Sequence, residues 1–357
     1  MSWRFDYTWS LSDSSFAKDK GKVFSCFACG GGSTMGYKLA GFDVVGCNEI
    51  DPRMMSLYVQ NHKPKYAFLE PIQEFKHRDD LPAELYNLDI LDGSPPCSTF
   101  SMVGSREASW GIKKKFKEGQ AEQVLDTLFF DFIDLAKKLQ PKVVIAENVK
   151  GLLLGKAKDY VGRIYEGFDD AGYYCQHFLL DAATMGVPQR RERVFFVSLR
   201  KDLAEPFLVQ DGLFFQKPKL ELTFKEKCIV FGEIADQKGK EIYSGKTREL
   251  WEKRRAGDSS LGEASTREYN KRRFFSNTFL YLNKVSPTLM AREDRLICFD
   301  VPRYLSKAEV CKVSSFPQDY NFGTQSPHYV CGMSVPPVMM AQIANGVWEQ
   351  WLSQLIH

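Results

Sequence analysis

One of the nine cysteines stands where a nucleophile would be expected. Cys97 follows a short apolar run at residues 88–91 and the dipeptide Pro95-Pro96, and a mostly polar segment, 98–101, comes after it. The two proline rings fix φ and favour extended backbone in the residue before each of them, so Cys97 is held on a stiff stretch of chain. A buried structural role is the commoner one for cysteine, but the polar neighbours argue against a core position. We therefore predict that Cys97 is a nucleophile that reacts as the thiolate.

Two acids and two arginines could assist such a nucleophile. Glu49 and Glu147 each follow an apolar run, and Arg191 and Arg193 lie in the charged segment 189–193, directly before another apolar run. A carboxyl group beside a thiol can protonate or hydrogen-bond a substrate ring when its environment raises its pKa. Guanidinium groups can neutralise charge that develops on the ring. Charged segments usually lie on solvated surfaces, so the prediction depends on elements that bring these residues to one place.

Short apolar runs alternate with helical patterns between residues 23 and 199, which predicts the α/β class. The carboxyl ends of parallel strands lie along one edge of a sheet, where ligands bind. Glu49, Cys97 and Glu147 should therefore converge at that edge. We predict helices at 33–40, 52–61, 121–140, 306–315 and the C-terminus, and strands at 23–28, 43–48, 66–75 (a short strand and a turn), 88–91, 142–146, 173–181 and 193–199.

A glycine-rich turn, Gly30 to Gly32, joins the first predicted strand to the first predicted helix. Glycine lets the backbone approach a ligand closely, and the amino end of a helix favours an anionic group. The pattern of nicotinamide-binding folds would need its third glycine at position 35, which is Met35, and Gly36 comes one residue late. We therefore exclude an NAD-dependent oxidoreductase. Glu49, after the next strand, stands where such folds bind ribose hydroxyls.

The composition limits the kind of protein. Of the 357 residues, 44% are hydrophobic and 26% charged, which suits a globular protein with one large and one smaller domain. We expect a cytoplasmic protein, because no apolar run reaches the ~18 residues of a membrane helix and residues 1–20 lack the features of a signal peptide. An odd number of scattered cysteines does not suit a disulfide framework. Cys26 and Cys29 form a C-x-x-C without a second pair at zinc spacing, so we predict no metal site.

Basic residues concentrate in two parts of the chain, although the net charge is only +3. Residues 98–120 hold five basic and two acidic side chains, and residues 201–285 hold 17 basic and 13 acidic ones. In the second part, basic clusters at 253–255 and 271–273 are interleaved with aromatic residues. Such surfaces suit nucleic acids, because phosphate contacts dominate their affinity. We predict that 98–120 closes over a phosphate backbone and that 201–285 carries a nucleic-acid surface.

Taken in order, the motifs resemble those of the cytosine-C5 DNA methyltransferases, which use S-adenosylmethionine, over nearly all of residues 23–350. The implied fold is an α/β, Rossmann-like S-adenosylmethionine-dependent methyltransferase sheet with a smaller target-recognition domain. Residues 1–200 and 285–357 would form the catalytic and cofactor-binding domain, and residues 201–284 the target-recognition domain. The motifs that carry the resemblance are Phe27-Ala28 with Gly31, Gly32 and Gly36; Glu49; Pro95-Pro96-Cys97 with Phe100-Ser101; Glu147-Asn148-Val149; Gln189, Arg191 and Arg193; and Gly332 to Pro336.

The resemblance also assigns roles to individual residues. It makes Cys97, Glu147, Arg191 and Arg193 catalytic. The implied cofactor-binding residues are Phe27, Ala28, Gly30, Gly31, Gly32, Glu49, Ile50, Ser94, Pro96 and Ser334. The implied nucleic-acid-binding residues are Ser101, Arg106, Lys113, Lys114, Lys115, Gln189, Arg254, Arg255, Arg272 and Arg273. In the implied reaction the Cys97 thiolate adds to C6 of a flipped-out cytosine, while Glu147 holds the N3 edge and the two arginines neutralise the adduct.

Four residues depart from the family's patterns. Cys29 replaces a glycine of the cofactor loop, and Pro71 replaces an aspartate that meets the adenine amine. Ser98 replaces a glutamine and Met333 an asparagine. These changes bear on cofactor affinity and leave the four catalytic positions intact, so we predict an active enzyme.

The expected partner is double-stranded DNA. We expect a monomeric modification enzyme of a bacterium or phage that acts at the nucleoid, and a cognate restriction endonuclease can accompany it. An RNA cytosine-C5 methyltransferase is the main alternative, since a relative that modifies transfer RNA shares the catalytic motifs. Its Cys-Phe-Thr signature is missing here, and the long segment 201–284 favours duplex DNA. A non-catalytic nucleic-acid-binding protein on the same fold is a further alternative, against which the intact Cys97 and Glu147 argue.

Overall fold

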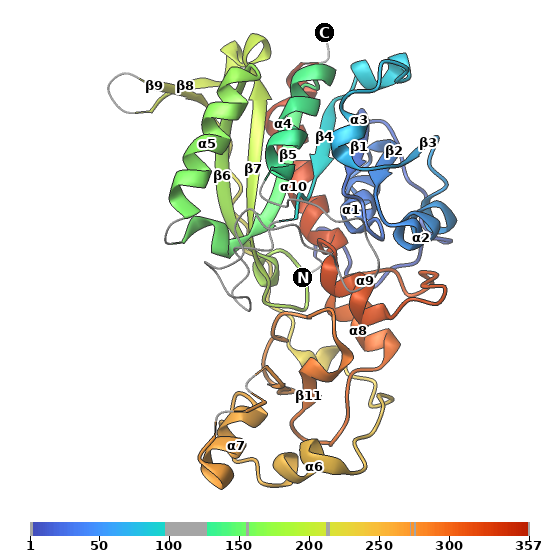
Figure 1. The fold of residues 1–357 in the computed structure, drawn as a ribbon, viewed down its shortest axis with the longest axis vertical. Helices are drawn as coiled ribbons and strands as arrows, with labels where there is room; N and C mark the ends of the chain where they lie inside the picture. The colour runs from blue at the N-terminus through green and yellow to red at the C-terminus, as the bar shows by residue number, and fades with distance from the viewer. Residues whose placement is uncertain are drawn as a thin grey trace. The chain divides into compact units, whose positions relative to one another are not determined.

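The computed structural model describes residues 3–96, 127–154, 157–211, 215–271, 273–274 and 276–355 (Figure 1). The chain divides into two compact units. Unit 1 comprises Met1–Ser14, Asp181–Arg191 and Phe224–Met339, and unit 2 comprises Ser15–Leu180, Glu192–Thr223 and Met340–His357. The division by function, with 1–200 and 285–357 as the catalytic domain and 201–284 as the target-recognition domain, stays a prediction.

Unit 2 is organised around a sheet that has seven strands among the described residues (Figure 1). Parallel pairs join β1 to β2, β2 to β3, β1 to β4 and β4 to β5, whereas β7 runs antiparallel to β5. The strand order reverses between β1 and β4, and ligands in such sheets bind beyond the carboxyl ends of the strands at that point. The order is β3-β2-β1-β4-β5-β7-β6, with β1 (Lys22–Cys26), β2 (Asp43–Glu49), β3 (Tyr66–Leu69), β4 (Ile90–Gly93), β5 (Val143–Val149), β6 (Tyr173–Asp181) and β7 (Glu192–Arg200).

The central strands are buried along almost their whole length, as expected for parallel strands with both faces covered. Helix α4 (Leu128–Leu139) packs on them with a stripe of buried residues that includes Leu128, Phe132 and Leu139. A Cβ atom at Gly93 would lie 2.5 Å from the ring of Phe132. Glycine at the end of β4 therefore allows α4 to approach the strand that leads toward Cys97.

The other helices of unit 2 include one that the sequence analysis did not predict. This is α5 (Ala157–Asp170), in which Tyr160, Ile164 and Phe168 are buried at intervals of four residues. Gly162 and Gly167 interrupt the sequence pattern, because glycine disfavours helix interiors. The remaining elements are α1 (Gly32–Leu39), α2 (Pro52–His62), α3 (Ile72–Phe75), α10 (Pro337–Gln350), which begins in unit 1, and the antiparallel hairpin of β8 (Leu208–Asp211) and β9 (Phe215–Pro218).

Unit 1 has a smaller core of its own, centred on Leu250, Leu261, Phe279 and Ile297. A buried ion pair joins the segment before α8 to its first turn, where Arg303 Nη1 is 2.7 Å from the carboxylate of Glu309. Within the described part of the chain, no helix combines the length and the apolar character needed to cross a membrane. The elements of unit 1 are α6 (Gly245–Glu252), α7 (Leu261–Tyr269), α8 (Lys307–Val313), α9 (Pro327–Met333) and the parallel pair β10 (Thr278–Leu280) and β11 (Leu296–Cys298).

Candidate active site

Glu49, the last residue of β2, holds the glycine-rich loop that follows β1. Its buried carboxyl accepts hydrogen bonds from the backbone N–H groups of Cys29 at 2.7 Å, Ile50 at 2.8 Å and Asp51 at 2.9 Å. Burial raises the pKa of Glu49, and the three N–H donors oppose this effect. Cys29, which replaces a glycine of the family's pattern, therefore takes part in the loop through its backbone.

The loop has a strained backbone that its surroundings hold in place. Phe27 and Cys29 have φ angles of 53° and 47°, a region that non-glycine residues rarely adopt. At Gly31, where φ is 81°, a Cβ atom would lie 2.1 Å from Nε2 of His62. This nitrogen lies 3.1 Å from the carbonyl oxygen of Gly30, to which it donates. Burial lowers the pKa of His62 to about 3, so the ring is neutral, and strain of this kind is typical of functional sites.

These residues fit an adenosine-bearing cofactor. A carboxylate has about four acceptor positions, and the three N–H groups on Glu49 leave capacity for a ribose hydroxyl. Gly31 is the N-cap of α1, and no side chain that the structure describes caps this helix, so its amino end can receive an anionic group. Pro71, which replaces an aspartate of the family's pattern, is the N-cap of α3 and offers no carboxylate to an adenine amine.

Asp92, in β4, is a candidate that the sequence analysis did not single out. Its buried carboxyl accepts hydrogen bonds from the hydroxyls of Ser33 at 2.7 Å, Ser25 at 2.8 Å and Tyr37 at 3.2 Å. Burial raises the pKa of Asp92 to about 6; the three hydroxyls lower it and nearby Glu147 raises it. Because Ser25 is in β1 and the other two donors are in α1, the network fixes the start of α1 against the strand that leads toward Cys97.

Glu147 and Arg193 form an ion pair at the carboxyl edge of the sheet. Arg193 is directly opposite Val149 in the antiparallel pairing of β7 with β5. Glu147 shares a face with Val149, because side chains two residues apart on a strand point the same way. Nε of Arg193 lies 3.0 Å from Oε1 of Glu147, and the side chains are only 16% and 12% exposed. Burial lowers the pKa of Arg193 and nearby Glu147 opposes this, and a guanidinium stays protonated in proteins.

Asn148 ties this edge to the proline turn. Its Nδ2 donates a hydrogen bond to the carbonyl oxygen of Pro95 at 3.1 Å, and its Oδ1 accepts one from the backbone N–H of Val149 at 2.8 Å. Ser94 and Pro96, both predicted to bind cofactor, are half-buried in the same turn. Cys97, the predicted nucleophile, lies outside the described residues.

Arg191 and Gln189 belong to unit 1, where their side chains hold backbone segments. The guanidinium of Arg191 donates to the carbonyl oxygens of Gly332 at 3.0 Å and Leu289 at 3.3 Å. Gln189 donates to the carbonyl oxygen of Val313 and accepts from the N–H of Leu289. These contacts give both residues a structural role, and their contacts with substrate stay predictions.

The segment after α9 supplies two further predicted positions in unit 1. The hydroxyl of Ser334 donates to the carbonyl oxygen of Val330 at 2.7 Å and so closes the last turn of α9. Gly332 lies so close to the backbone of Met290 and Ala291 that a Cβ atom would be 2.6 Å from both. Met333, which replaces an asparagine of the family's pattern, is 51% exposed.

The predicted nucleic-acid contacts divide into residues inside and outside the described part. Arg254 stacks on Trp251, 3.3 Å from the ring centroid, and its Nε donates to the carbonyl oxygen of Phe299 at 2.7 Å. This arginine therefore joins α6 to the end of β11. Arg255 and Arg273 are exposed. Ser101, Arg106, Lys113, Lys114, Lys115 and Arg272 lie outside the described residues.

The described residues contain no group of histidine, cysteine and carboxylate side chains that could hold a metal ion. Cys26 is buried, and burial together with Asp92 raises its pKa well above the ordinary value. Cys29, half-buried, has its sulfur 3.7 Å from that of Met54.

Known proteins resemble this chain in sequence and in fold. A profile described as "C-5 cytosine-specific DNA methylase" matches residues 21–348. The Type II methyltransferase M.FnuDI of Fusobacterium nucleatum is 37% identical over 182 residues, 51% of this chain, and the chain spans about half, 48%, of that relative. M.NgoFVII of Neisseria gonorrhoeae is 26% identical over 350 residues, which are 94% of this chain and 89% of the relative.

A solved structure of a candidate DNA modification methyltransferase encoded within an Escherichia coli prophage has a TM-score of 0.63. It is 20% identical, and the match covers 92% of this chain and 99% of that one. This likeness confirms the predicted α/β, Rossmann-like methyltransferase fold. The profile covers far more than half of the sequence and confirms the resemblance seen in the motifs, so the chain belongs to the C-5 cytosine-specific DNA methylase family.

Proposed function

We propose that this chain transfers a methyl group from S-adenosylmethionine to C5 of a cytosine flipped out of double-stranded DNA, through a covalent bond between Cys97 and C6. Membership of the family supports the reaction class and the cofactor. The observation that carries the proposal is the tie between Asn148 and Pro95 beside the Glu147–Arg193 ion pair. The turn that leads to the nucleophile and the acid that holds the substrate ring thus belong to one rigid edge.

In the proposed reaction the sulfur of Cys97 forms a bond to C6, and the electron pair of the C5–C6 double bond moves to C5. Bound S-adenosylmethionine supplies the methyl group that C5 takes up. Loss of the C5 proton to a base then returns an electron pair, which expels the Cys97 thiolate and restores the ring. Glu147 holds the protonated N3 edge while charge develops, and Arg193 keeps the Glu147 carboxyl oriented through their 3.0 Å contact.

Most of the residues that we propose hold the cofactor lie in unit 2, in or beside the loop after β1. Glu49 has acceptor capacity for a ribose hydroxyl, and the uncapped amino end of α1 suits the carboxylate of the methionine part. Phe27, partly exposed in the strained loop, offers a ring face. The other candidates remain Ala28, Gly30, Gly31, Gly32, Ile50, Ser94, Pro96 and Ser334.

We propose duplex DNA as the partner, with residues 201–284 as the segment that selects its sequence, and a monomeric modification enzyme that a cognate restriction endonuclease can accompany. The family description names DNA cytosine, which favours DNA over the RNA alternative. Exchange of 201–284 for the corresponding segment of a relative with a different target should move methylation to that relative's site. Methylation that stays at the original site would place recognition elsewhere.

The test of the reaction is methylation of plasmid DNA by the purified protein, mapped by bisulfite sequencing. We expect Cys97→Ala to abolish methylation and to retain DNA binding, whereas Cys228→Ala, which removes an exposed thiol, serves as the matched control. A duplex with 5-fluorocytosine at the mapped site should trap an adduct at Cys97, because fluorine cannot leave C5 as a proton does. Methylation by the Cys97→Ala protein, or methylation of transfer RNA with none on DNA, would refute the proposal.

A further inference from the structure

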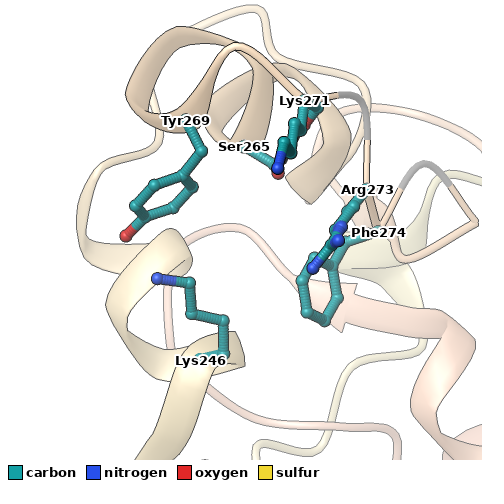
Figure 2. A pocket seen from close by; sticks show the side chains of 6 residues that line it. All are labelled: Lys246, Ser265, Tyr269, Lys271, Arg273 and Phe274. Carbon is teal, nitrogen blue, oxygen red and sulfur yellow. Dashed lines mark hydrogen bonds between the residues drawn. The ribbon is translucent and has the colours of Figure 1, made fainter.

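Unit 1 contains a pocket of about 550 Å³ beside α6 and α7 (Figure 2). This volume falls in the range of sites that bind small molecules. Three of its lining side chains are cationic, two are aromatic and none is acidic. The lining residues of this α7 pocket are Lys246, Ser265, Tyr269, Lys271, Arg273 and Phe274.

The wall that α6 contributes is nearly neutral. Nζ of Lys246 lies 3.6 Å from the centroid of the Tyr269 ring and 3.0 Å from the carboxylate of Glu249. The same carboxylate accepts a hydrogen bond from the hydroxyl of Tyr269. Glu249 thus neutralises Lys246 and fixes the Tyr269 ring at the edge of the pocket.

The opposite wall carries the positive charges of Lys271 and Arg273. Within the described ranges, neither Lys271 nor Arg273 forms an ion pair, and both side chains are exposed. Figure 2 shows them directed toward the space that the Phe274 ring bounds. Three carboxylates in this part of the unit pair with other cations, Glu249 with Lys246, Asp258 with Arg267 and Glu268 with Lys253.

The backbone that presents these two cations is held in an unusual shape. The carbonyl oxygen of Lys271 accepts hydrogen bonds from the hydroxyl of Ser265 and from the N–H of Arg273, both at 2.8 Å. Asn270 and Phe274, which flank the two cations, have φ angles of 50° and 60°. Asn270 is the C-cap of α7, where asparagine readily adopts left-handed backbone, whereas the same conformation is costly for Phe274. These backbone hydrogen bonds therefore hold Lys271 and Arg273 beside the pocket.

We infer that the α7 pocket binds one nucleotide of the DNA backbone, with its phosphate between Lys271 and Arg273 and its sugar against the rings of Phe274 and Tyr269. This inference rests on the proposed function and names one contact within the predicted DNA surface. Arginine binds two phosphate oxygens at once, and lysine adds a point charge. The pocket is larger than a phosphate alone requires, and its aromatic walls accept the apolar face of a sugar. Such a contact adds affinity and carries no sequence information.

The test measures binding of a labelled random-sequence duplex to the full chain over a range of salt concentrations. Loss of one phosphate contact should flatten the slope of log K against log salt by about 0.9. Because either cation alone still neutralises the shared phosphate, we expect this flattening in the double variant and a smaller one in Lys271→Ala and Arg273→Ala. The affinity of the double variant at moderate salt should fall about tenfold or more. Lys137→Ala, which removes an exposed lysine of α4 outside the predicted DNA surface, should leave the slope unchanged.

Other outcomes would overturn the inference. A slope loss of about 1.8 in the double variant would mean two separate phosphates. An equal effect of Lys137→Ala would mean that only the net charge of the protein matters. Deoxycytidine monophosphate could use the same chemistry, so its binding is measured without DNA. Nucleotide binding that the double variant loses, with DNA binding unchanged, would assign the pocket to a free nucleotide.

The inference and the proposed function fail in different ways. Wild-type protein that methylates DNA, beside a double variant with unaltered affinity and slope, would refute the pocket alone. Wild-type protein that neither methylates nor binds DNA would refute both.

Discussion

The substitution Asp92→Asn removes a buried charge and keeps the shape of the side chain. In the wild-type protein the carboxyl accepts hydrogen bonds from the hydroxyls of Ser25, Ser33 and Tyr37. An asparagine can accept from one hydroxyl and donate to another, because a hydroxyl can serve as either partner. The substitution therefore retains most of the network and removes the ionisation.

The expected change in stability follows from the pKa. Burial raises the pKa of Asp92 from 3.8 to about 6, so the ionised carboxylate costs the folded state about 3 kcal/mol. Between these pH values the folded protein keeps a proton that the unfolded chain has lost. The contribution of Asp92 to the free energy of unfolding is therefore largest below about pH 4. It falls as the pH rises to about 6 and is constant above that pH. The amide of the variant forms weaker hydrogen bonds than the carboxyl group, which lowers the free energy of unfolding by about 1 kcal/mol at every pH.

We expect Asp92→Asn to be more stable than the wild-type protein by about 2 kcal/mol at pH 7.5, and less stable by about 1 kcal/mol at pH 4. Urea denaturation followed by tryptophan fluorescence at a series of pH values measures the difference. Asp79→Asn, which removes a fully exposed carboxyl, is the matched control and should show no such change of sign. A difference between Asp92→Asn and wild type that stays constant from pH 4 to 7.5 would refute the reasoning.

Three further substitutions test other buried contacts. Arg193→Leu leaves the Glu147 carboxylate without its partner and should lower the free energy of unfolding by about 3 kcal/mol; the double variant Glu147→Gln/Arg193→Leu should recover most of this loss in urea denaturation. Gly31→Ala places a Cβ atom 2.1 Å from His62 at a φ of 81°, so we expect it to abolish the thermal shift caused by S-adenosylmethionine, whereas Gly172→Ala, at a φ of 91° with no atom within 4 Å, should retain it. Glu309→Gln breaks the ion pair with Arg303, in which the side chains of Arg303 and Glu309 are 5% and 0% exposed. In urea denaturation it should lower the free energy of unfolding by about 3 kcal/mol or more.

The sheet could be predicted from the sequence because its strands are apolar on both faces. The predicted strand 43–48 is one residue shorter than β2, and 173–181 coincides with β6. The run 88–91 is displaced, since β4 spans Ile90–Gly93 and so includes the charged Asp92. In the part after residue 201, α6 and α7 have only eight and nine residues and mostly polar surfaces. Their apolar residues are therefore too few to predict a helix from the sequence.

The supports of the site depend on contacts between residues far apart in the chain. Asp92 looks like the polar end of a strand, and only the fold brings three hydroxyls from positions 25, 33 and 37 to its carboxyl. His62 is the last residue of α2, where an exposed ring would be expected, yet it supports the turn at Gly30 and Gly31. Arg254 sits in a basic cluster that suggests a DNA surface, but Trp251 and Phe299 give its guanidinium an internal partner.

The network around Asp92 also bears on the charge of the ligand. Glu49 ends β2, Asp92 is in β4 and Glu147 is in β5, with β1 between β2 and β4 in the sheet. Of these three acids, Glu147 alone forms an ion pair with a cation that the structure describes. S-adenosylmethionine is a sulfonium cation, whereas its demethylated product is a neutral thioether. A cation bound at this edge favours the ionised form of Asp92, so binding and loss of the proton assist each other. The affinity for S-adenosylmethionine should therefore rise between pH 5 and 7 more than that for the product, and calorimetry should find this excess absent in Asp92→Asn. Equal pH dependence for both ligands would mean that Asp92 acts only through the position of α1.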